Sequence, residues 1–251
     1  MKYIKDNYKF LIFVIIICII GSYFTTIYSL SIIDEKALEE AIKQVGSKNI
    51  VIAITAIQTI IYAIIFSILG LIISNKVGLW HKFKKNKKAI ITTIIIAIIG
   101  GLCISLIDKY IFGYFIKEVY HLYDDKPTAY YIISCFTYGG VLEEVLMRLF
   151  LMSLISLIIS KLFYKKEKKI PTKVYIIANI ICAVLFAAGH IPATIELFHH
   201  LNFLILLRCF LLNGALGLCF GYLYRKYSIH YSMLAHVGCH LLSITLRLLF
   251  I

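Results

Sequence analysis

The stretch FLIFVIIICIIGSYFTTIYSLSI, residues 10–32, decides the fold, because an uncharged apolar run of this length can cross a bilayer as a helix. The run is long and has no small-residue cleavage site, so we interpret it as a retained span and not as a signal peptide. Six further apolar stretches predict spanning helices. They lie at residues 50–73, 89–107, 129–160, 174–191, 201–223 and 230–250.

The composition is typical of a membrane protein. Of the 251 residues, 61% are hydrophobic, whereas soluble domains contain about 45–50% apolar residues. We therefore predict an all-α, polytopic transmembrane helix bundle of about seven spans, which forms a single transmembrane domain over residues 1–251. The lipid bilayer is its expected partner, and its expected location is the cell membrane, as a multi-pass integral protein. No feature of the sequence predicts an oligomeric state.

The distribution of the basic residues predicts the orientation. The net charge is +13, and the loops at residues 75–88 and 161–173 carry six lysines each. Strongly basic loops recur at every second turn of the chain, as cytoplasmic loops do, so we expect a cytoplasmic N-terminus and a C-terminus outside. The basic segments do not alternate with aromatic residues in the manner of a nucleic-acid groove, so we expect no nucleic-acid partner. Residues 108–127 predict an aromatic outer loop, which either lies in the membrane interface or simply connects two spans.

The stretch YGGVLEEVLMRLF, residues 138–150, puts three charged side chains inside the fourth span. An ionisable group in a span costs at least about 2.5–3.5 kcal/mol, so each is a candidate for function. Glu144 and Arg148 are four residues apart, so they share a helix face and can pair. A buried ion pair that fixes helix packing explains these two residues. Glu143 lies about 100° around the helix and needs a partner of its own.

Three histidines lie in later spans. His190 ends the motif FAAGH, residues 186–190, near the end of the fifth span. His236 and His240 in HVGCH are four residues apart, so both project from one face of the seventh span. A lone histidine at a helix end is more often structural than a ligand. The histidine pair predicts either hydrogen bonds between helices or a shared metal ion, although no HExxH motif is present.

Together these residues predict two kinds of site. Glu143, His190, His236 and His240 form a plausible zinc-binding set. They equally form a water-activating carboxylate with histidine donors for an oxyanion. The seven cysteines contain no CxxC pair, so the sequence does not indicate a thiolate zinc site. Two polar residues of the sixth span are expected either to line the cavity or to stabilise packing: Arg208 and Asn213.

The order and spacing of these motifs resemble a known family. EEVLMR (143–148) matches EExxxR, FAAGH matches FxxxH, and a third motif begins at His236. Over about residues 130–245, the chain resembles the CAAX protease and bacteriocin-processing family of intramembrane proteases, also called the Abi family. The resemblance implies an active-site cavity within the bilayer, where a peptide or protein substrate is cut. It implies that Glu143 and His190 activate the water, that His236 and His240 stabilise the oxyanion or help to hold a metal, and that Glu144 and Arg148 orient the first pair.

The resemblance predicts an intramembrane endopeptidase of the CAAX type, and zinc is its candidate cofactor. The family often has Asn where this chain has His240, and imidazole is the better zinc ligand, so this difference favours a metalloendopeptidase slightly. Two other functions stay open: a non-enzymatic bacteriocin self-immunity protein, and a proton-coupled transporter in which buried Glu and His relay protons. The predicted spans also put His190 near an outer helix end and His236 near an inner one, so the two could meet only if the fifth span starts later or the seventh reaches inward.

Overall fold

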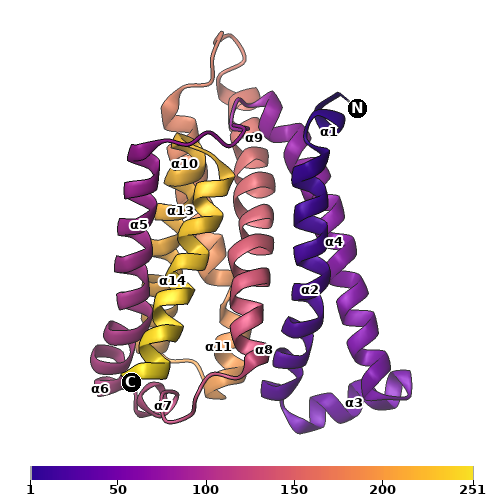
Figure 1. The fold of residues 1–251 in the computed structure, drawn as a ribbon, viewed down its shortest axis with the longest axis vertical. Helices are drawn as coiled ribbons and strands as arrows, with labels where there is room; N and C mark the ends of the chain where they lie inside the picture. Colours follow the sequence, from indigo (N-terminus) through magenta and orange to yellow (C-terminus); the bar gives the residue numbers. More distant parts are fainter. Residues whose placement is uncertain (1, 251) are drawn as a thin grey trace.

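The computed structural model describes residues 2–250, which form a bundle of helices and contain no β-strand (Figure 1). Within these residues, seven helical spans are long and apolar enough to cross a membrane, which confirms the predicted all-α transmembrane bundle. The chain is therefore an integral membrane protein. The spans run over Tyr8–Ile32, Lys48–Lys76, Lys87–Phe115, Ala129–Phe163, Thr172–Phe198, Phe203–Lys226 and Ile229–Leu249.

Several spans are built from more than one helical segment. The first, second and seventh spans are the single helices α2 (Tyr8–Ile32), α4 (Lys48–Lys76) and α14 (Ile229–Leu249). Three others contain π-helical segments, in which each N–H bonds the carbonyl five residues earlier. The third span is α5 (Lys87–Leu102), η1 (Cys103–Phe112) and α6 (Gly113–Phe115), and the fourth is α8 (Ala129–Ser134), η2 (Cys135–Glu143), η3 (Val145–Met152) and α9 (Ser153–Phe163). The fifth is α10 (Thr172–Gly189) and α11 (Ile191–Phe198). The sixth is α12 (Phe203–Cys209), η4 (Phe210–Gly214) and α13 (Ala215–Lys226). Three short helices lie outside the spans: α1 (Lys2–Asp6), α3 (Glu35–Val45) and α7 (Lys117–His121).

Polar side chains define where four of the spans begin. Ser47, Asn86, Thr128 and Asn202 each accept a hydrogen bond from the backbone N–H three residues later. Such a cap satisfies one of the free N–H groups in the first turn of a helix. Four span starts therefore follow from short local signals.

The seventh span packs closely against the third, and glycine makes this approach possible. A Cβ atom added to Gly101 of α5 would lie only 3.0 Å from the carbonyl oxygen of Cys239 on α14. Small residues at such a contact let two helix backbones come together inside a membrane. Through this contact α14, which carries His236 and His240, lies side by side with α5 (Figure 1).

Two spans continue well beyond their predicted ends. The third continues to Phe115, because the charges of Asp108 and Lys109 are accommodated within the protein, so most of the predicted 108–127 loop is helical. The fifth continues to Phe198, because Pro192 stands in the first turn of α11, where its missing N–H costs no hydrogen bond. The fifth span therefore begins close to its predicted start, at Thr172, but ends seven residues later than predicted, and His190 lies well inside it.

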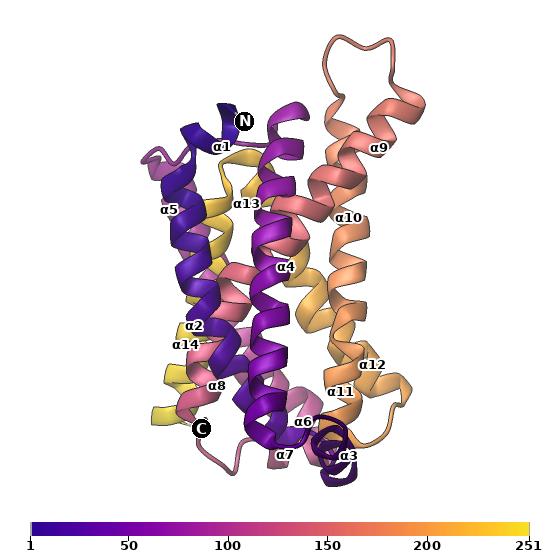
Figure 2. The same ribbon diagram turned by 90° about the vertical axis from the view of Figure 1, so that its right-hand side faces the viewer.

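The two ends of the bundle differ in charge. The N-terminus and the basic 75–88 and 161–173 loops lie at one end, and the C-terminus lies at the other (Figure 1). The view from the side shows the 161–173 loop extending beyond the other helix ends (Figure 2). This arrangement agrees with the positive-inside pattern. The assignment of the basic end to the cytoplasm stays a prediction.

Candidate active site

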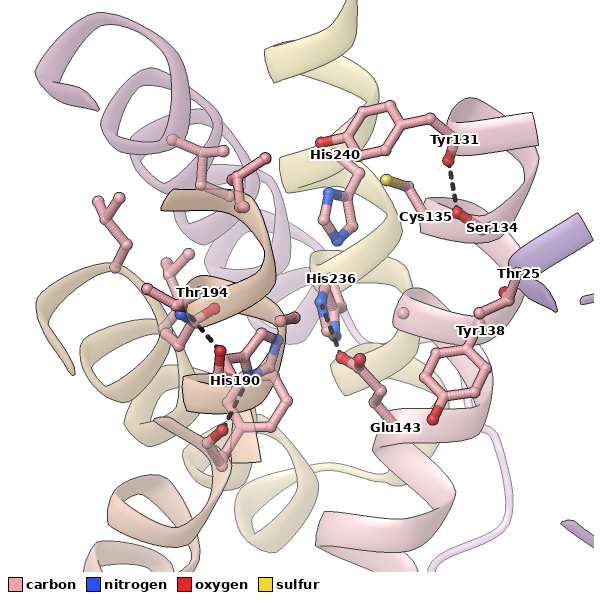
Figure 3. Close-up of a pocket in the computed structure, with 18 of the residues that line it drawn as sticks. Thr25, Tyr131, Ser134, Cys135, Tyr138, Glu143, His190, Thr194, His236 and His240 are labelled. Atoms are coloured by element: carbon pink, nitrogen blue, oxygen red, sulfur yellow. Dashed lines mark hydrogen bonds and ion pairs between the residues drawn. The ribbon is translucent and has the colours of Figure 1, made fainter. Parts of the chain in front are cut away.

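A cavity of about 380 Å³ lies inside the bundle and receives four of the predicted site residues (Figure 3). Glu143 ends η2, His190 joins α10 to α11, and His236 and His240 lie two turns and three turns into α14. All four line the cavity. The π-helical fourth span, the extended fifth span and the close packing of α14 thus bring three separate motifs to one place.

Glu144 lies behind the cavity wall and is fully buried. Its Oε1 accepts a hydrogen bond from His236 Nδ1 at 3.0 Å, and its Oε2 accepts one from the hydroxyl of Ser232. The Nε atom of Arg148 lies 3.6 Å from Oε2. Glu144 therefore pairs with Arg148 as the spacing indicates, but it orients His236 and not Glu143 or His190.

Arg148 joins three spans. It is fully buried, and its Nη2 donates to the carbonyl oxygen of Gly217 in the sixth span at 3.0 Å. Its guanidinium carbon lies 4.7 Å from the ring centre of Phe186 in the fifth span and 5.7 Å from that of Phe220 in the sixth. A cation over an aromatic face is stabilised where water is excluded. Arg148 thus holds Phe186, one turn before His190, against the fourth span.

His236 occupies the centre of the site. Because the Glu144 carboxylate only accepts hydrogen bonds, Nδ1 carries the hydrogen of this contact, and the neutral ring presents a lone pair at Nε2. That Nε2 lies 3.9 Å from Oε2 of Glu143. The ring is held between Phe220, with ring centres 4.5 Å apart, and His240, with ring centres 5.0 Å apart. Glu144, Phe220 and His240 therefore fix the position of the His236 ring.

Glu143 is the accessible carboxylate of the pair. Its side chain keeps 19% of its surface exposed, whereas that of Glu144 keeps none. It points toward His236 along the cavity wall (Figure 3). The separation of 3.9 Å is too long for a direct hydrogen bond but allows one water molecule to bond both groups. As helical geometry predicts, Glu143 and Glu144 therefore lie in different environments, one facing the cavity and the other buried.

His190 lies across the cavity from Glu143 (Figure 3). Its Nδ1 donates to the carbonyl oxygen of Phe186 at 2.8 Å, so the neutral ring presents Nε2 as an acceptor. The ring of Phe186 contacts both sides of the site, with its centre 4.7 Å from that of His190 and 6.1 Å from that of His236. The fifth span does not start later, as the predicted depths required, but it continues to Phe198, so His190 lies inside the span and not at its outer end.

His240 stacks on His236 with an angle of 22° between the rings. Gly139, one turn before Glu143, makes room for both rings. A Cβ atom at this position would lie 3.2 Å from Nε2 of His240 and 3.9 Å from Nε2 of His236. The glycine therefore lets the imidazole edges approach the backbone of the fourth span.

The four predicted zinc ligands do not form a metal site in this arrangement. The Nδ1 atoms of His236 and His190 are bonded to Glu144 and to a carbonyl oxygen, which leaves Nε2 of each ring free, as it is in histidines that bind a metal. Across residues 2–250, no group of three or more His, Cys, Asp or Glu side chains is arranged to hold a metal ion. The residue types suit zinc but their geometry here does not fit it, so participation of zinc stays a prediction.

An ion pair that the sequence did not reveal forms another part of the cavity wall. Arg208 donates from Nε and Nη2 to the two carboxylate oxygens of Asp108, at 2.5 and 2.6 Å. The hydroxyl of Tyr123 lies 3.0 Å from Asp108, and burial, then the nearby carboxylate, raises the pKa of Tyr123 well above its usual range. Arg208 was expected either in the cavity wall or in packing contacts, and it does both. Its partner was missed because Asp108 fell in the predicted loop.

The comparison with protein families bears on this site. Residues 125–242 match the model described as type II CAAX prenyl endopeptidase Rce1-like. The match covers slightly less than half of the chain, and over these residues the chain is similar to the Rce1-like family. All six predicted site residues lie within the match, and the resemblance to CAAX-type intramembrane proteases is confirmed. No curated protein and no solved structure matched the chain.

The Rce1-like region does not enclose the cavity alone. Thr25 and Tyr28 on α2 and Asp108 on η1 also line it, and all three precede residue 125.

Ser232, which donates a hydrogen bond to Glu144, was not among the predicted site residues. Its position four residues before His236 was the available signal, because residues with that spacing share a helix face.

Proposed function

We propose that this Rce1-like protein is an intramembrane endopeptidase in which Glu143 acts as the general base. The observation that carries the proposal is the unequal environment of two adjacent carboxylates. Glu144 is buried and engaged with Arg148, Ser232 and His236, whereas Glu143 faces the cavity beside the free Nε2 of His236. A base must reach the proton that it removes, and only Glu143 has that access.

In the proposed reaction, Glu143 takes a proton from a water molecule held between it and His236. The water oxygen forms a bond to the scissile carbonyl carbon, and the carbonyl oxygen becomes an oxyanion. An N–H group of His240 donates to this oxyanion, and the acceptor Nε2 of His190 orients the substrate amide or a second water. Glu143 then returns the proton to the leaving nitrogen as the C–N bond breaks. Preorganised donors of this kind are among the largest contributions to catalysis.

The cavity supports a peptide substrate. Its lining combines apolar and aromatic side chains with a few polar groups, which is typical of a site that binds an extended organic ligand. We propose cleavage at a segment that enters the cavity within the bilayer. A protein that confers immunity without catalysis would keep its protective effect after loss of Glu143, so the same variant separates these functions.

The test compares the membrane proteins of cells that express the wild-type chain with those of cells that express Glu143→Gln. Mass spectrometry identifies new N- and C-termini. We expect cleavage products with the wild type and with the matched control Glu39→Gln, whose side chain is exposed on α3. Glu143→Gln should reduce these products by about 10²–10⁴-fold, the usual contribution of a general base. If no product distinguishes the wild type from Glu143→Gln, the proposal is wrong.

A separate experiment tests whether the protein binds zinc. Elemental analysis of purified wild-type protein and of His240→Asn measures bound zinc directly. Stoichiometric zinc that is lost on chelation together with activity would support the zinc prediction. Full activity in zinc-free protein would support the reaction described above.

A further inference from the structure

A second cavity, of about 580 Å³, lies at the basic end of the bundle, and none of the residues that line it lines the active-site cavity. The segment between α4 and α5 forms one side, and the connection between α13 and α14 forms the other. Four lysines, one histidine, one asparagine and three aromatic residues line it, and no Asp or Glu does so. These residues are Trp80, His81, Lys82, Lys84, Lys85, Asn86, Lys226, Tyr227 and Tyr231.

Hydrogen bonds hold the two sides of this cavity together. The hydroxyl of Tyr231 donates to the carbonyl oxygen of Lys84 at 2.8 Å and accepts from the backbone N–H of Asn86 at 3.0 Å. Tyr231 is only 2% exposed, and the ring of Phe83 packs 5.5 Å from its ring. Two segments about 145 residues apart in sequence thus form one fixed surface, so the cavity does not depend on a mobile loop.

The charge of this cavity is not neutralised by the protein. Among the described residues, none of its four lysines forms a salt bridge with a carboxylate. Lysines that line a hollow, with an amide and a phenol beside them, suit the oxygens of a phosphate ester. The cavity therefore has the chemistry of an anion site.

The surface next to the cavity is apolar. α5 begins at Lys87, directly after the cavity lining, and four of its isoleucines are 46–51% exposed on the outside of the bundle: Ile91, Ile94, Ile95 and Ile98. An isolated phosphate would use only the basic part of this surface. A phospholipid would use both parts, with its headgroup in the cavity and its acyl chains along α5. Basic pockets at the cytoplasmic ends of spans bind anionic headgroups in this way.

We propose that the cavity between the α4–α5 segment and the α13–α14 connection binds the headgroup of an anionic phospholipid. The inference does not rest on the proposed protease activity. It concerns only residues outside the active site.

The test measures lipid retention by native mass spectrometry of the purified full-length chain. The probes are dioleoyl-phosphatidylglycerol, dioleoyl-phosphatidylcholine and inorganic phosphate. We expect the wild type to retain phosphatidylglycerol at least about tenfold better than phosphatidylcholine. The triple variant Lys84→Gln/Lys85→Gln/Lys226→Gln should lose affinity on the order of 100-fold, since each lysine near an anionic headgroup contributes about fivefold.

The matched control is Lys165→Gln/Lys166→Gln/Lys168→Gln, which removes the same charge from the extended loop at the same end of the bundle. It should bind phosphatidylglycerol like the wild type. The variant Lys84→Arg/Lys85→Arg/Lys226→Arg keeps the charge and should also retain the lipid. If the glutamine triple variant does not fold, Lys226→Gln alone should weaken binding about fivefold.

Three results would overturn the proposal. The first is equal loss of phosphatidylglycerol in the control triple variant, which would reveal a general effect of charge. The second is equal retention of phosphatidylcholine. The third is displacement of the lipid by an equal concentration of inorganic phosphate, which would identify a site for free phosphate.

Discussion

Glu143 and Glu144 are neighbours in the chain but occupy different environments. One faces a cavity, and the other is enclosed by Arg148, Ser232 and His236. Substitution of each by glutamine keeps the shape of the side chain and removes its charge. The two substitutions should therefore have different effects on stability.

We expect Glu144→Gln to destabilise the protein by about 3–5 kcal/mol, because the guanidinium of Arg148 would remain buried without its carboxylate. Glu143→Gln should leave stability nearly unchanged. Thermal unfolding of the purified proteins in detergent measures both. The double variant Glu144→Gln/Arg148→Met should recover part of the loss. Equal stability of the two single variants would contradict the environment assigned to Glu144.

Gly139 makes a second prediction possible at this scale. Gly139→Ala would put a methyl group 3.2 Å from Nε2 of His240 and force the stacked rings to move. A displacement of about 1 Å at a reacting group can cost about 10²-fold in rate, so cleavage should fall strongly. Gly189→Ala is the matched control, because a Cβ there meets nothing within 4 Å. Comparable cleavage by both variants would show that the rings do not need this space.

Helical geometry correctly predicted that Glu144 pairs with Arg148 and that Glu143 points elsewhere. The rotation of about 100° between successive residues was enough to separate Glu143 from the Glu144–Arg148 pair. It could not predict that Glu144 would orient His236, because that contact joins residues 92 positions apart. Ser232 was missed for a related reason, since a serine in an apolar helix usually bonds its own backbone.

At the scale of the helices, Asp108 and Arg208 connect the third and sixth spans. Both carboxylate oxygens accept hydrogen bonds from the guanidinium. Asp108→Asn should therefore destabilise the protein by about 3–5 kcal/mol, because it leaves a largely buried cation without a counterion. Asp125→Asn is the control, since its side chain is exposed and surface changes usually stay within about 0.5 kcal/mol.

Thermal unfolding again provides the measurement. Asp108→Asn/Arg208→Met should be more stable than Asp108→Asn alone. If removal of the arginine brings no recovery, the ion pair does not hold these spans together.

Span boundaries were predicted well where the local sequence determines them and poorly where a distant partner does. The caps at Ser47, Asn86, Thr128 and Asn202 lie within a few residues of the predicted starts. The third span was ended too early because Asp108 looks like a loop residue until Arg208 is known to lie beside it. The fifth was ended at residue 191, directly before Pro192; proline breaks a helix in its interior but is tolerated in a first turn.

At the scale of the whole molecule, the two ends of the bundle predict the orientation in the membrane. The substitution Lys166→Cys puts a cysteine in the 161–173 loop at the basic end. The substitution Lys43→Cys puts one on α3 at the other end (Figure 2). In intact cells, an impermeant maleimide should label Lys43→Cys and leave Lys166→Cys unlabelled until the membrane is opened. The seven native cysteines all lie within the spans, so the background should be low. The opposite labelling pattern would invert the predicted topology.

The cavity has walls from both halves of the chain, but the motifs come from one half only. Thr25, Tyr28 and Asp108 contact the same space as Glu143 and His190, yet they lie outside the matched residues 125–242. In the proposed protease, catalytic machinery and substrate selection would therefore diverge separately. Two relatives with identical motifs would choose different peptides by exchanging their first three spans.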